Sequence, residues 1–286
     1  MISHGMISLG VAGSVNLDIV ASVQRLPRPG ETITGADLHR FPGGKGGNQA
    51  LAAQRLGAQV SLVARVGDDA SADEALALLR AGGVDLSNCR PVTGVATGTA
   101  LIAVDPEGEN HIVVAPGANT RLAPEDLGEL AFDALICQLE IPGDTVAAAA
   151  RRFGGFYCVN LAPAREIDAS VLQRADLVVV NQTEAEWYGA TLAACHGMVA
   201  ITRGAGEATL EKEGEVIARA RPATVTAVDT TGAGDTFTAA LTVALVEGRD
   251  PVAALRFACA AAALATTRMG AQPSLPTREE VLAHGQ

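Results

Sequence analysis

The sequence lacks a stripe of lysine and arginine. Its 286 residues include 21 basic and 32 acidic side chains, which gives a formal net charge of −11 and a pI of about 4.9. Lysine itself occurs twice, at Lys45 and Lys212. Proteins that bind nucleic acid or an anionic membrane surface concentrate positive charge on one face. We therefore expect neither nucleic acid nor a membrane as a partner.

The sequence also lacks paired cysteines, a leader and a long apolar run. Its five cysteines are scattered and never in CxxC spacing, which argues against a disulfide framework or a zinc site and favours a reducing, cytoplasmic setting. The N-terminus has no basic region followed by a long apolar stretch, so we expect no signal peptide. The alanine-rich tract 257–265 is too short to span a bilayer and predicts a buried helix.

What the sequence does contain is 48% apolar residues and an alternation of short apolar runs with helical patterns. Strands are expected at 7–12, 60–64, 134–139, 156–160, 177–180 and 199–202. Helices are expected at 48–56, 72–81, 144–152, 236–246 and 251–267. Near-continuous apolar strands between helices are typical of a parallel sheet covered on both faces. We therefore expect one α/β domain over 1–286, with a doubly wound and mostly parallel sheet.

Two segments break the alternation. Residues 31–41 look extended, and 99–114 look like a hairpin around the turn residues Asp105-Pro106-Glu107-Gly108. A few strands without helices between them, set inside an α/β chain, predict a small β-sheet lid. We expect the segments at about 16–42 and 97–116 to form it. Such a lid can close over a site and exclude water.

Polar side chains follow five of the expected strands. They are Asn16 with Asp18, Glu140, Asn160, Asn181 and Thr202. In open α/β sheets, ligands bind beyond the carboxyl ends of the strands, so these side chains could line one site. Most loops are polar in any protein, and the pattern alone leaves both readings open.

A glycine-rich loop, FPGGKGGNQ, spans 41–49 and opens an expected helix. It is not a Walker A loop, because Gly46 rather than Ser or Thr follows Lys45. Nor is GVAGSV, near the N-terminus, a dinucleotide fingerprint, because the third glycine is missing. The loop at 41–49 is either a flexible hinge or a place where the backbone approaches a small polar ligand, with Asn48 as a contact.

A second glycine loop, TTGAGDTF (230–237), places Asp235 at the start of a helix. An aspartate there can cap the helix. It can equally act as a base beside glycine N–H groups that bind an anion. Carboxylates and amides elsewhere, such as Asp18, Asn48 and Glu140, can form paired hydrogen bonds to the vicinal hydroxyls of a ligand. The five histidines lie outside these motifs, so no catalytic triad is indicated. Phosphoryl transfer, which needs positioning, a metal, an anion site and one base, is the reaction class that fits.

As a set, these motifs resemble the ribokinase-like (PfkB) sugar kinases. GSVNLDIV, PGETITG, GGKGGNQA, EGEN, NQTEAE, AVDTTGAGDTF and TRMGAQPS occur in that family's order over nearly the whole chain. The resemblance implies an ATP-dependent kinase for the primary 5-hydroxyl of D-ribose. It leaves open 2-deoxyribose, fructose, 2-keto-3-deoxygluconate or a nucleoside as the substrate. A sugar sensor without activity is the alternative from another class, because a fold does not fix a function.

The resemblance also implies a role for each matching residue. Asp235 would be the proton acceptor as well as the helix cap. Sugar contacts would come from Asn16, Asp18, Gly44, Lys45, Asn48 and Glu140. The nucleotide and Mg²⁺ would lie near Asn181, Glu184, Thr202, Gly204, Gly206, Gly232, Ala233, Gly234 and Cys259. A monovalent cation, expected to be K⁺, would lie among Asp229, Thr231, Ala265, Arg268, Gly270 and Ser274. The lid would join two copies in a homodimer.

The segment between Glu186 and Thr202 departs from the family pattern. It has fifteen residues, fewer than the resemblance to the ribokinase-like kinases implies. We expect a trimmed helix there, which puts packing on the nucleotide side in doubt but not the chemistry. The loop TRGAGE (202–207) also differs from the family's usual form.

Overall fold

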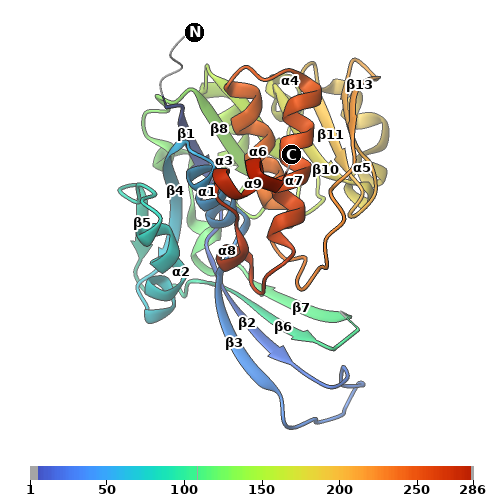
Figure 1. The fold of residues 1–286 in the computed structure, drawn as a ribbon. Helices are drawn as coiled ribbons and strands as arrows, with labels where there is room; N and C mark the ends of the chain where they lie inside the picture. Colours follow the sequence, from blue (N-terminus) through green and yellow to red (C-terminus); the bar gives the residue numbers. More distant parts are fainter. Residues whose placement is uncertain (1–5, 108, 285–286) are drawn as a thin grey trace.

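The structure is a computed structural model that describes residues 6–107 and 109–284. Gly108 of the predicted hairpin turn lies outside the described residues. The described chain forms a nine-stranded sheet flanked by helices and a separate four-stranded sheet. Figure 1 shows the four-stranded sheet extending from one edge of the α/β body.

The large sheet has the strand order β13-β12-β11-β10-β9-β8-β1-β4-β5. Its strands are β1 (Ser8–Ala12), β4 (Gln59–Gly67), β5 (Cys89–Val92), β8 (Ala134–Gln138), β9 (Phe156–Asn160), β10 (Leu177–Asn181), β11 (Met198–Thr202), β12 (Ala208–Lys212) and β13 (Glu215–Ala220). Neighbours from β5 to β11 run parallel, and β12 and β13 add an antiparallel hairpin at one edge. All six predicted strands are present, and the mostly parallel sheet is confirmed. The sequence analysis missed β5, β12 and β13.

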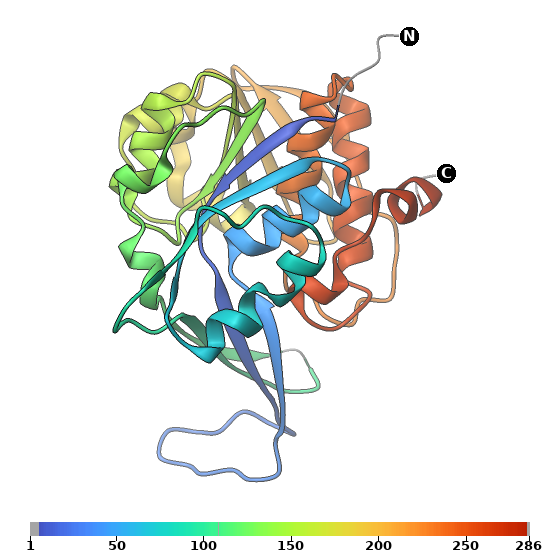
Figure 2. The same cartoon turned by 90° about the vertical axis from the view of Figure 1, so that its left-hand side faces the viewer.

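Helices cover both faces of this sheet, as Figure 2 shows. They are α1 (Lys45–Arg55), α2 (Ala70–Ala81), α3 (Gly143–Arg152), α4 (Ala169–Arg174), α5 (Gln182–Tyr188), α6 (Ala233–Val246), α7 (Pro251–Ala265), α8 (Ala271–Ser274) and α9 (Arg278–His284), with 3₁₀ helices η1 (Gly117–Arg121), η2 (Pro124–Leu127) and η3 (Gly189–Ala194). All five predicted helices are present. No helix of the described residues is long and apolar enough to cross a membrane.

The two faces of the sheet pack against separate hydrophobic cores. Leu9 and Val11 of β1 point into the core shared with α1, α6 and α7, whereas Ala12 joins the core beneath α3 and α4. Burying one leucine or valine side chain stabilises a fold by about 1.5–3 kcal/mol. The doubly wound arrangement that the alternating pattern predicts is therefore confirmed.

The small sheet, which we call the lid, has the order β3-β2-β6-β7. Its strands are β2 (Asn16–Ser22), β3 (Asp37–Gly43), β6 (Gly98–Val104) and β7 (Asn110–Ala115). The predicted hairpin is present as β6 and β7, and the side chain of Asp105 accepts the N–H groups of Glu107 and Glu109 in its turn. Residues 31–36, predicted to be extended, precede the strand and form no ladder, because β3 begins at Asp37.

The lid has two distinct faces, because side chains alternate along each strand. Leu101 pairs directly with Val113, and both are more than half exposed on the outer face. Asp18 pairs with Phe41, and both line a cleft on the inner face. The lid therefore turns Asp18 and Phe41, together with apolar side chains such as Val20 and Ile102, toward the α/β body, and leaves Leu101 and Val113 exposed on the side away from it.

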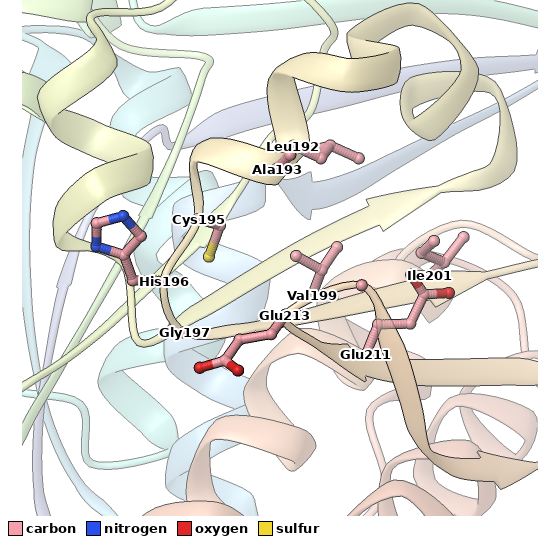
Figure 3. Close-up of a pocket in the computed structure, with 10 residues that line it drawn as sticks. Leu192, Ala193, Cys195, His196, Gly197, Val199, Ile201, Glu211 and Glu213 are labelled. Atoms are coloured by element: carbon pink, nitrogen blue, oxygen red, sulfur yellow. The ribbon is translucent and has the colours of Figure 1, made fainter.

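The short segment between α5 and β11 holds the 3₁₀ helix η3 in place of a full helix, as the sequence predicted. A pocket of ≈ 480 Å³ lies beside it, over β11 and β12. Figure 3 shows Val199 and Ile201 of β11 on its floor, with His196 and Glu213 at its rim. The trimmed helix thus leaves part of one sheet face uncovered.

Candidate active site

The polar residues predicted at the strand ends meet at one edge of the large sheet. Parallel pairing places Gln138 beside Asn160 and Asn181 beside Thr202. The first lid strand begins at Asn16, directly after β1, so the lid rises from the same edge. This edge holds the candidate site.

The glycine loop before α1 is closely packed and is not a hinge. Gly44 has φ 82°, a conformation that suits glycine, and a Cβ there would lie 2.7 Å from the backbone nitrogen of Asn16. A Cβ on Gly46 would lie 2.5 Å from the backbone carbon of Gly13. The loop therefore needs glycine to let its backbone contact the chain after β1.

Glu140 is tied to this loop at the end of β8. Its Oε2 accepts the Ser14 hydroxyl at 2.5 Å and the Lys45 N–H at 3.1 Å. The Ser14 oxygen in turn accepts the Gly46 N–H at 3.3 Å. Ser14, which the sequence analysis missed, therefore links the carboxylate to the loop.

Asn16 is oriented by another residue that the sequence analysis missed. Nδ2 of Asn119 donates to Oδ1 of Asn16 at 2.7 Å, and Oδ1 of Asn119 accepts the Val15 N–H at 2.9 Å. Because the side-chain oxygen of Asn16 faces Asn119, its side-chain nitrogen points away from Asn119. Asn119 belongs to η1, and no sequence pattern near it predicts this contact.

Asp235 lies in the first turn of α6 and is buried, with 6% of its surface exposed. Its Oδ2 accepts Nδ2 of Asn48 at 2.9 Å, and its Oδ1 accepts Nε2 of Gln49 at 2.9 Å. The prediction that Asp235 caps the helix is wrong, because Gly232 holds the cap position and the aspartate points toward α1 instead. The two amides of α1 take both carboxylate oxygens.

The start of α6 is open to a ligand. No side chain of the described residues caps it, and a Cβ on Gly234 would meet no described atom within 4 Å. The first N–H groups of a helix have no acceptor within the helix, and the helix dipole attracts negative charge. This end therefore fits a phosphate group.

Four carboxylates surround one lysine in the site. Burial and, after it, the negative charges of Glu140 and Asp235 raise the pKa of Asp18 to about 7. Burial also raises the pKa of Asp235, although Lys45 and the two amides oppose the shift. Burial by itself lowers the pKa of Lys45, but Asp235, Glu140, Glu184 and Asp18 outweigh it and raise that pKa overall. Lys45 is thus the counter-charge of the site.

Asn181 and Glu184 form a capping box at the start of α5, directly after β10. Each side chain accepts the other's backbone N–H at 2.8 Å. Glu184 is 8% exposed, and burial raises its pKa. The predicted pair is therefore rigid, and its carboxylate lies within the electric field of Lys45 and Asp235.

A small pocket of ≈ 90 Å³ gathers most of the residues predicted to border the nucleotide. Its walls include Thr202, Gly204, Ala233, Gly234 and Cys259. Gly206 lies outside these walls, because its N–H turns back to the Arg203 carbonyl. Gly232, at φ 80°, makes the turn into α6.

A larger cleft of ≈ 630 Å³ lies between the inner lid face and two loops of the body. It is lined by Asp18 and Phe41 from the lid and by Asp229, Thr231 and Gly270 from the loops. The predicted sugar residue Asp18 and the loops predicted to hold a cation thus share one cleft.

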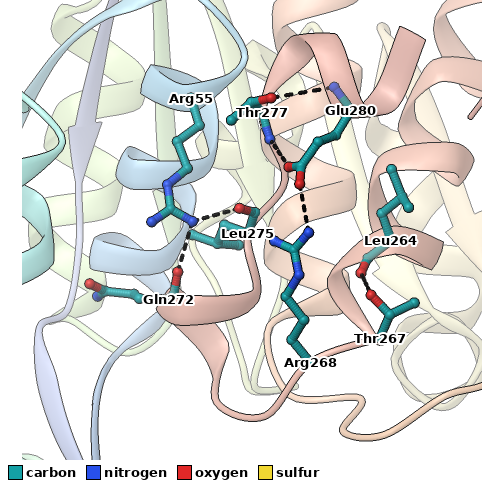
Figure 4. Close-up of polar contacts among 8 residues, drawn as sticks. All are labelled: Arg55, Leu264, Thr267, Arg268, Gln272, Leu275, Thr277 and Glu280. Atoms are coloured by element: carbon teal, nitrogen blue, oxygen red, sulfur yellow. Dashed lines mark hydrogen bonds and ion pairs between the residues drawn. The ribbon is translucent and has the colours of Figure 1, made fainter. Parts of the chain in front are cut away.

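The predicted cation residues form a tied pair of loops. Oδ1 of Asp229 accepts the Thr231 N–H at 2.9 Å, and its Oδ2 accepts the Gly270 N–H at 2.8 Å. The Ser274 hydroxyl donates to the Ala271 carbonyl, and Ala265 is buried at the end of α7. The Arg268 side chain turns outward to Glu280 at 2.6 Å, as Figure 4 shows. Arg268 could therefore offer a cation only its carbonyl oxygen.

The donors in these loops suit a hard cation. Carboxylate, hydroxyl and carbonyl oxygens are the ligands such ions prefer, and each bonded oxygen of Asp229 keeps a second lone pair. The described residues hold no cluster of three or more His, Cys, Asp or Glu side chains placed to bind a metal. A transition-metal site built from such side chains is therefore not part of the described structure.

Comparison with known proteins gives a consistent result. Residues 6–278 match the pfkB family of carbohydrate kinases. A ribokinase of Bacillus subtilis is 39% identical over 304 residues, covering 96% of this chain and 98% of that protein. A ribokinase structure from Thermotoga maritima has a TM-score of 0.88 at 35% identity and covers 98% of this chain and 99% of its own.

An Arabidopsis thaliana ribokinase complexed with ribose and ATP has a TM-score of 0.86 at 33% identity, and the match covers 99% of each chain. The family match spans nearly the whole described chain, and the relatives are covered over almost their full length. The chain belongs to the pfkB family of carbohydrate kinases.

Proposed function

We propose that this kinase transfers the γ-phosphoryl group of ATP to the primary 5-hydroxyl of D-ribose, giving ribose 5-phosphate and ADP. The observation that carries the proposal is the setting of Asp235. A buried carboxylate, held by Asn48 and Gln49, lies in the first turn of an uncapped helix that fits a phosphate. A base and an anion site side by side are what phosphoryl transfer to a hydroxyl requires. The ribokinases among the relatives support ribose as the acceptor.

The sugar side offers matching hydrogen-bond partners. Oδ1 of Asn48 is buried and has no partner among the described residues. A buried acceptor without a donor is costly, so a ligand hydroxyl bonded there would be stabilised. Asn16, Asp18 and Glu140 add an oriented amide and two carboxylates at the same edge, with the Lys45 ammonium and the Gly44 backbone beside them. This set suits a small polyol.

In the proposed reaction, Asp235 takes the proton of the 5-hydroxyl as that oxygen bonds to the γ-phosphorus, while the bond from the γ-phosphorus to the bridging oxygen breaks and ADP leaves. The N–H groups of Gly232 and Gly234, together with that of Ala233, which here donates to the Thr230 carbonyl at 3.3 Å, stabilise the charge on the transferring group. Lys45 offsets the negative charge of the surrounding carboxylates. The inner lid face excludes water, so that the sugar rather than water receives the phosphoryl group.

The residues on the nucleotide side fit ATP with Mg²⁺. Mg²⁺ in kinases keeps several waters and takes one or two carboxylates beside the phosphate oxygens. Glu184 offers such a carboxylate, with Asn181 beside it, and we infer that the pair orders the ion and its waters. When bound, Mg²⁺ would neutralise charge on the phosphates. Thr202, Gly204 and Cys259 would border the nucleoside.

We further infer that K⁺ binds between the loops joined by Asp229. Its ligands would be Asp229, Thr231, Ala265, Arg268, Gly270 and Ser274, several of them through carbonyl oxygens. The loop that carries Asp229 and Thr231 leads directly into Gly232 and α6. A cation held there would fix the position of the anion site without entering the reaction.

A sugar sensor without activity is the alternative from another class. A sensor needs the sugar contacts but has no use for a base beside an anion site. The fixed carboxylate of Asp235 therefore favours the enzyme, and the family match agrees with it.

We also propose that the protein is a cytoplasmic homodimer. All five cysteines are free thiols, which favours a reducing compartment. Leu38, Leu101 and Val113 are 51–64% exposed on the outer lid face. Apolar patches and open strand edges of this kind are normally covered by a partner, and a second lid would cover both.

The first prediction concerns the acceptor. In an ADP-release assay over a panel of sugars and nucleosides, we expect the highest kcat/KM with ribose, because the sugar-side residues match the ribokinase motifs. The panel should include 2-deoxyribose, fructose and 2-keto-3-deoxygluconate. An equal or higher kcat/KM on a ketohexose or a nucleoside would refute ribose as the substrate.

The second prediction concerns pH. The pKa of Asp18 is raised to about 7, first by burial and then by the charges of Glu140, Asp235 and Asp229, while Lys45 opposes the shift. Below about 7 the group is protonated in the sugar-free enzyme and loses acceptor capacity. We therefore expect kcat/KM for ribose to fall about tenfold per pH unit there. In Asp18→Asn this inflection should vanish; if it persists, another group is responsible for it.

The third prediction concerns the cation. With K⁺ as the monovalent ion, we expect kcat/KM to be about 5- to 150-fold higher than with tetramethylammonium, the usual range of coupling between two sites. The bulky ion cannot enter a cage of carbonyl oxygens. Equal activity with the two ions at matched ionic strength would contradict the K⁺ site.

The fourth prediction concerns assembly. Light scattering at micromolar concentration should give twice the chain mass of 29.1 kDa. Leu101→Glu should shift the protein to monomer, because it buries a charge in the lid contact. Leu282→Glu, at a leucine 46% exposed on α9, is the matched control and should stay dimeric. A monomeric wild type, with or without sugar, would rule the lid dimer out.

A further inference from the structure

Three buried amides form a chain that ends on Asp235. Nε2 of Gln138, the last residue of β8, donates to Oε1 of Gln49 at 2.6 Å. Nε2 of Gln49, on α1, donates to Oδ1 of Asp235 at 2.9 Å and to Oδ1 of Asn160 at 3.1 Å. Gln49 and Gln138 are both fully buried. The chain therefore runs from the large sheet to the proposed base.

The chain fixes which end of Gln49 faces the carboxylate. A side-chain amide can turn over and exchange its donor and acceptor ends. Gln138 occupies the acceptor end of Gln49 with an N–H group. Asn160 donates its Nδ2 to the Val179 carbonyl at 3.1 Å, so it presents its oxygen to Gln49. Asn160 thus requires the orientation in which Gln49 donates to Asp235, and the N–H of Gln138 satisfies the acceptor end that this orientation leaves, although Oε1 of Gln138 has no partner of its own among the described residues.

The second amide on Asp235 is not fixed in this way. Asn48 donates to the carboxylate, but its own Oδ1 has no partner among the described residues. Gln138 has a place prepared for it, because a Cβ on Gly13 would lie only 2.0 Å from Oε1 of Gln138. Glycine at position 13 therefore leaves the space in which Gln138 reaches Gln49.

We propose that Gln138 is a positioning residue for the phosphoryl-transfer reaction: through Gln49 it holds the Asp235 carboxylate in place and presents it with a fixed donor. The inference rests on the proposed function, since it assigns Asp235 as the base. Gln138 itself bonds to Gln49 and not to the carboxylate. It is also not among the residues that line the open cleft.

The electrostatics give the inference a measurable signature. Burial raises the pKa of Asp235, and hydrogen bonds from Asn48 and Gln49 lower it. Among the charged groups near it, Lys45 lowers this pKa and Glu140 raises it, and Asp18 and Glu184 lie in the same field. Losing the Gln49 bond while these groups stay in place raises the pKa of the base. The acid limb of the kcat profile then moves to higher pH.

Two variants of Gln138 test this. Gln138→Met keeps an unbranched chain of similar volume but removes the donor, so Oε1 of Gln49 loses its partner and only Asn160 and Asp235 still hold the amide. Gln138→Glu places an acceptor against Oε1 of Gln49, so the two oxygens repel each other and push the amide away from the position in which it donates to Asp235. Gln54→Met is the matched control, because Gln54 also lies on α1 but accepts the Val60 N–H of β4 instead.

We expect kcat to fall about 10- to 100-fold in Gln138→Met, the loss that follows when a bond to a charged group is removed. Gln138→Glu should lose more. KM for ribose and ATP should change little, because the sugar and nucleotide contacts remain. The acid limb of kcat should move to higher pH in both variants, further in Gln138→Glu, while Gln54→Met keeps the wild-type kcat and acid limb.

Circular dichroism and thermal melting should be used to check that each variant is folded. If one of the two Gln138 variants does not fold, the other is sufficient for the test. Wild-type kcat in a folded variant would overturn the inference. So would a loss of kcat with an unmoved acid limb, since that marks a merely structural role. If the wild type itself phosphorylates no acceptor, the proposed function fails; if it is active and the variants match it, only this inference fails.

Discussion

The burial of one carboxylate at the start of a helix organises this protein. Asp235 has lost most of its water, which disfavours its charge, and the structure offsets that cost with two amides, a lysine and a helix dipole. Each of these comes from a different constraint on the fold. The amides require α1 to begin close to the end of β1, and the dipole requires α6 to start without a side-chain cap.

The glycines follow from the same constraint. Gly44 and Gly46 let the loop before α1 contact the backbone after β1, which brings Asn48 and Gln49 to Asp235. On the opposite side, the Asp229 carboxylate ties the loop before α6 to Gly270. The lid rises from the same edge and faces the cleft with Asp18. The base, the anion site and the sugar site therefore all depend on two loops, one before α1 and one before α6, whose backbones are held close to neighbouring segments.

Local sequence patterns predicted most helices and strands of the α/β body, but they did not predict contacts between residues that are distant in the sequence. The six predicted strands and the helix at 233–246 announce themselves by apolar runs and periodicity. β12 and β13 carry mixed polar side chains at a half-exposed edge, so no apolar run marks them. Asn119 and Gln138 act on residues far away in sequence, and only the fold reveals their partners. The cap prediction for Asp235 failed because buried amides from α1 compete successfully for its oxygens.

The most direct test of the account is kcat of Asp235→Asn. The introduced amide keeps its oxygen toward Gln49, and Asn48 can turn its unpartnered Oδ1 to accept the new N–H group, so the melting temperature should change by no more than a few degrees. If Asp235 is the base, kcat falls by about 10² to 10⁴, with much smaller changes in the affinity for sugar and ATP. A folded Asp235→Asn protein with wild-type kcat would contradict the account.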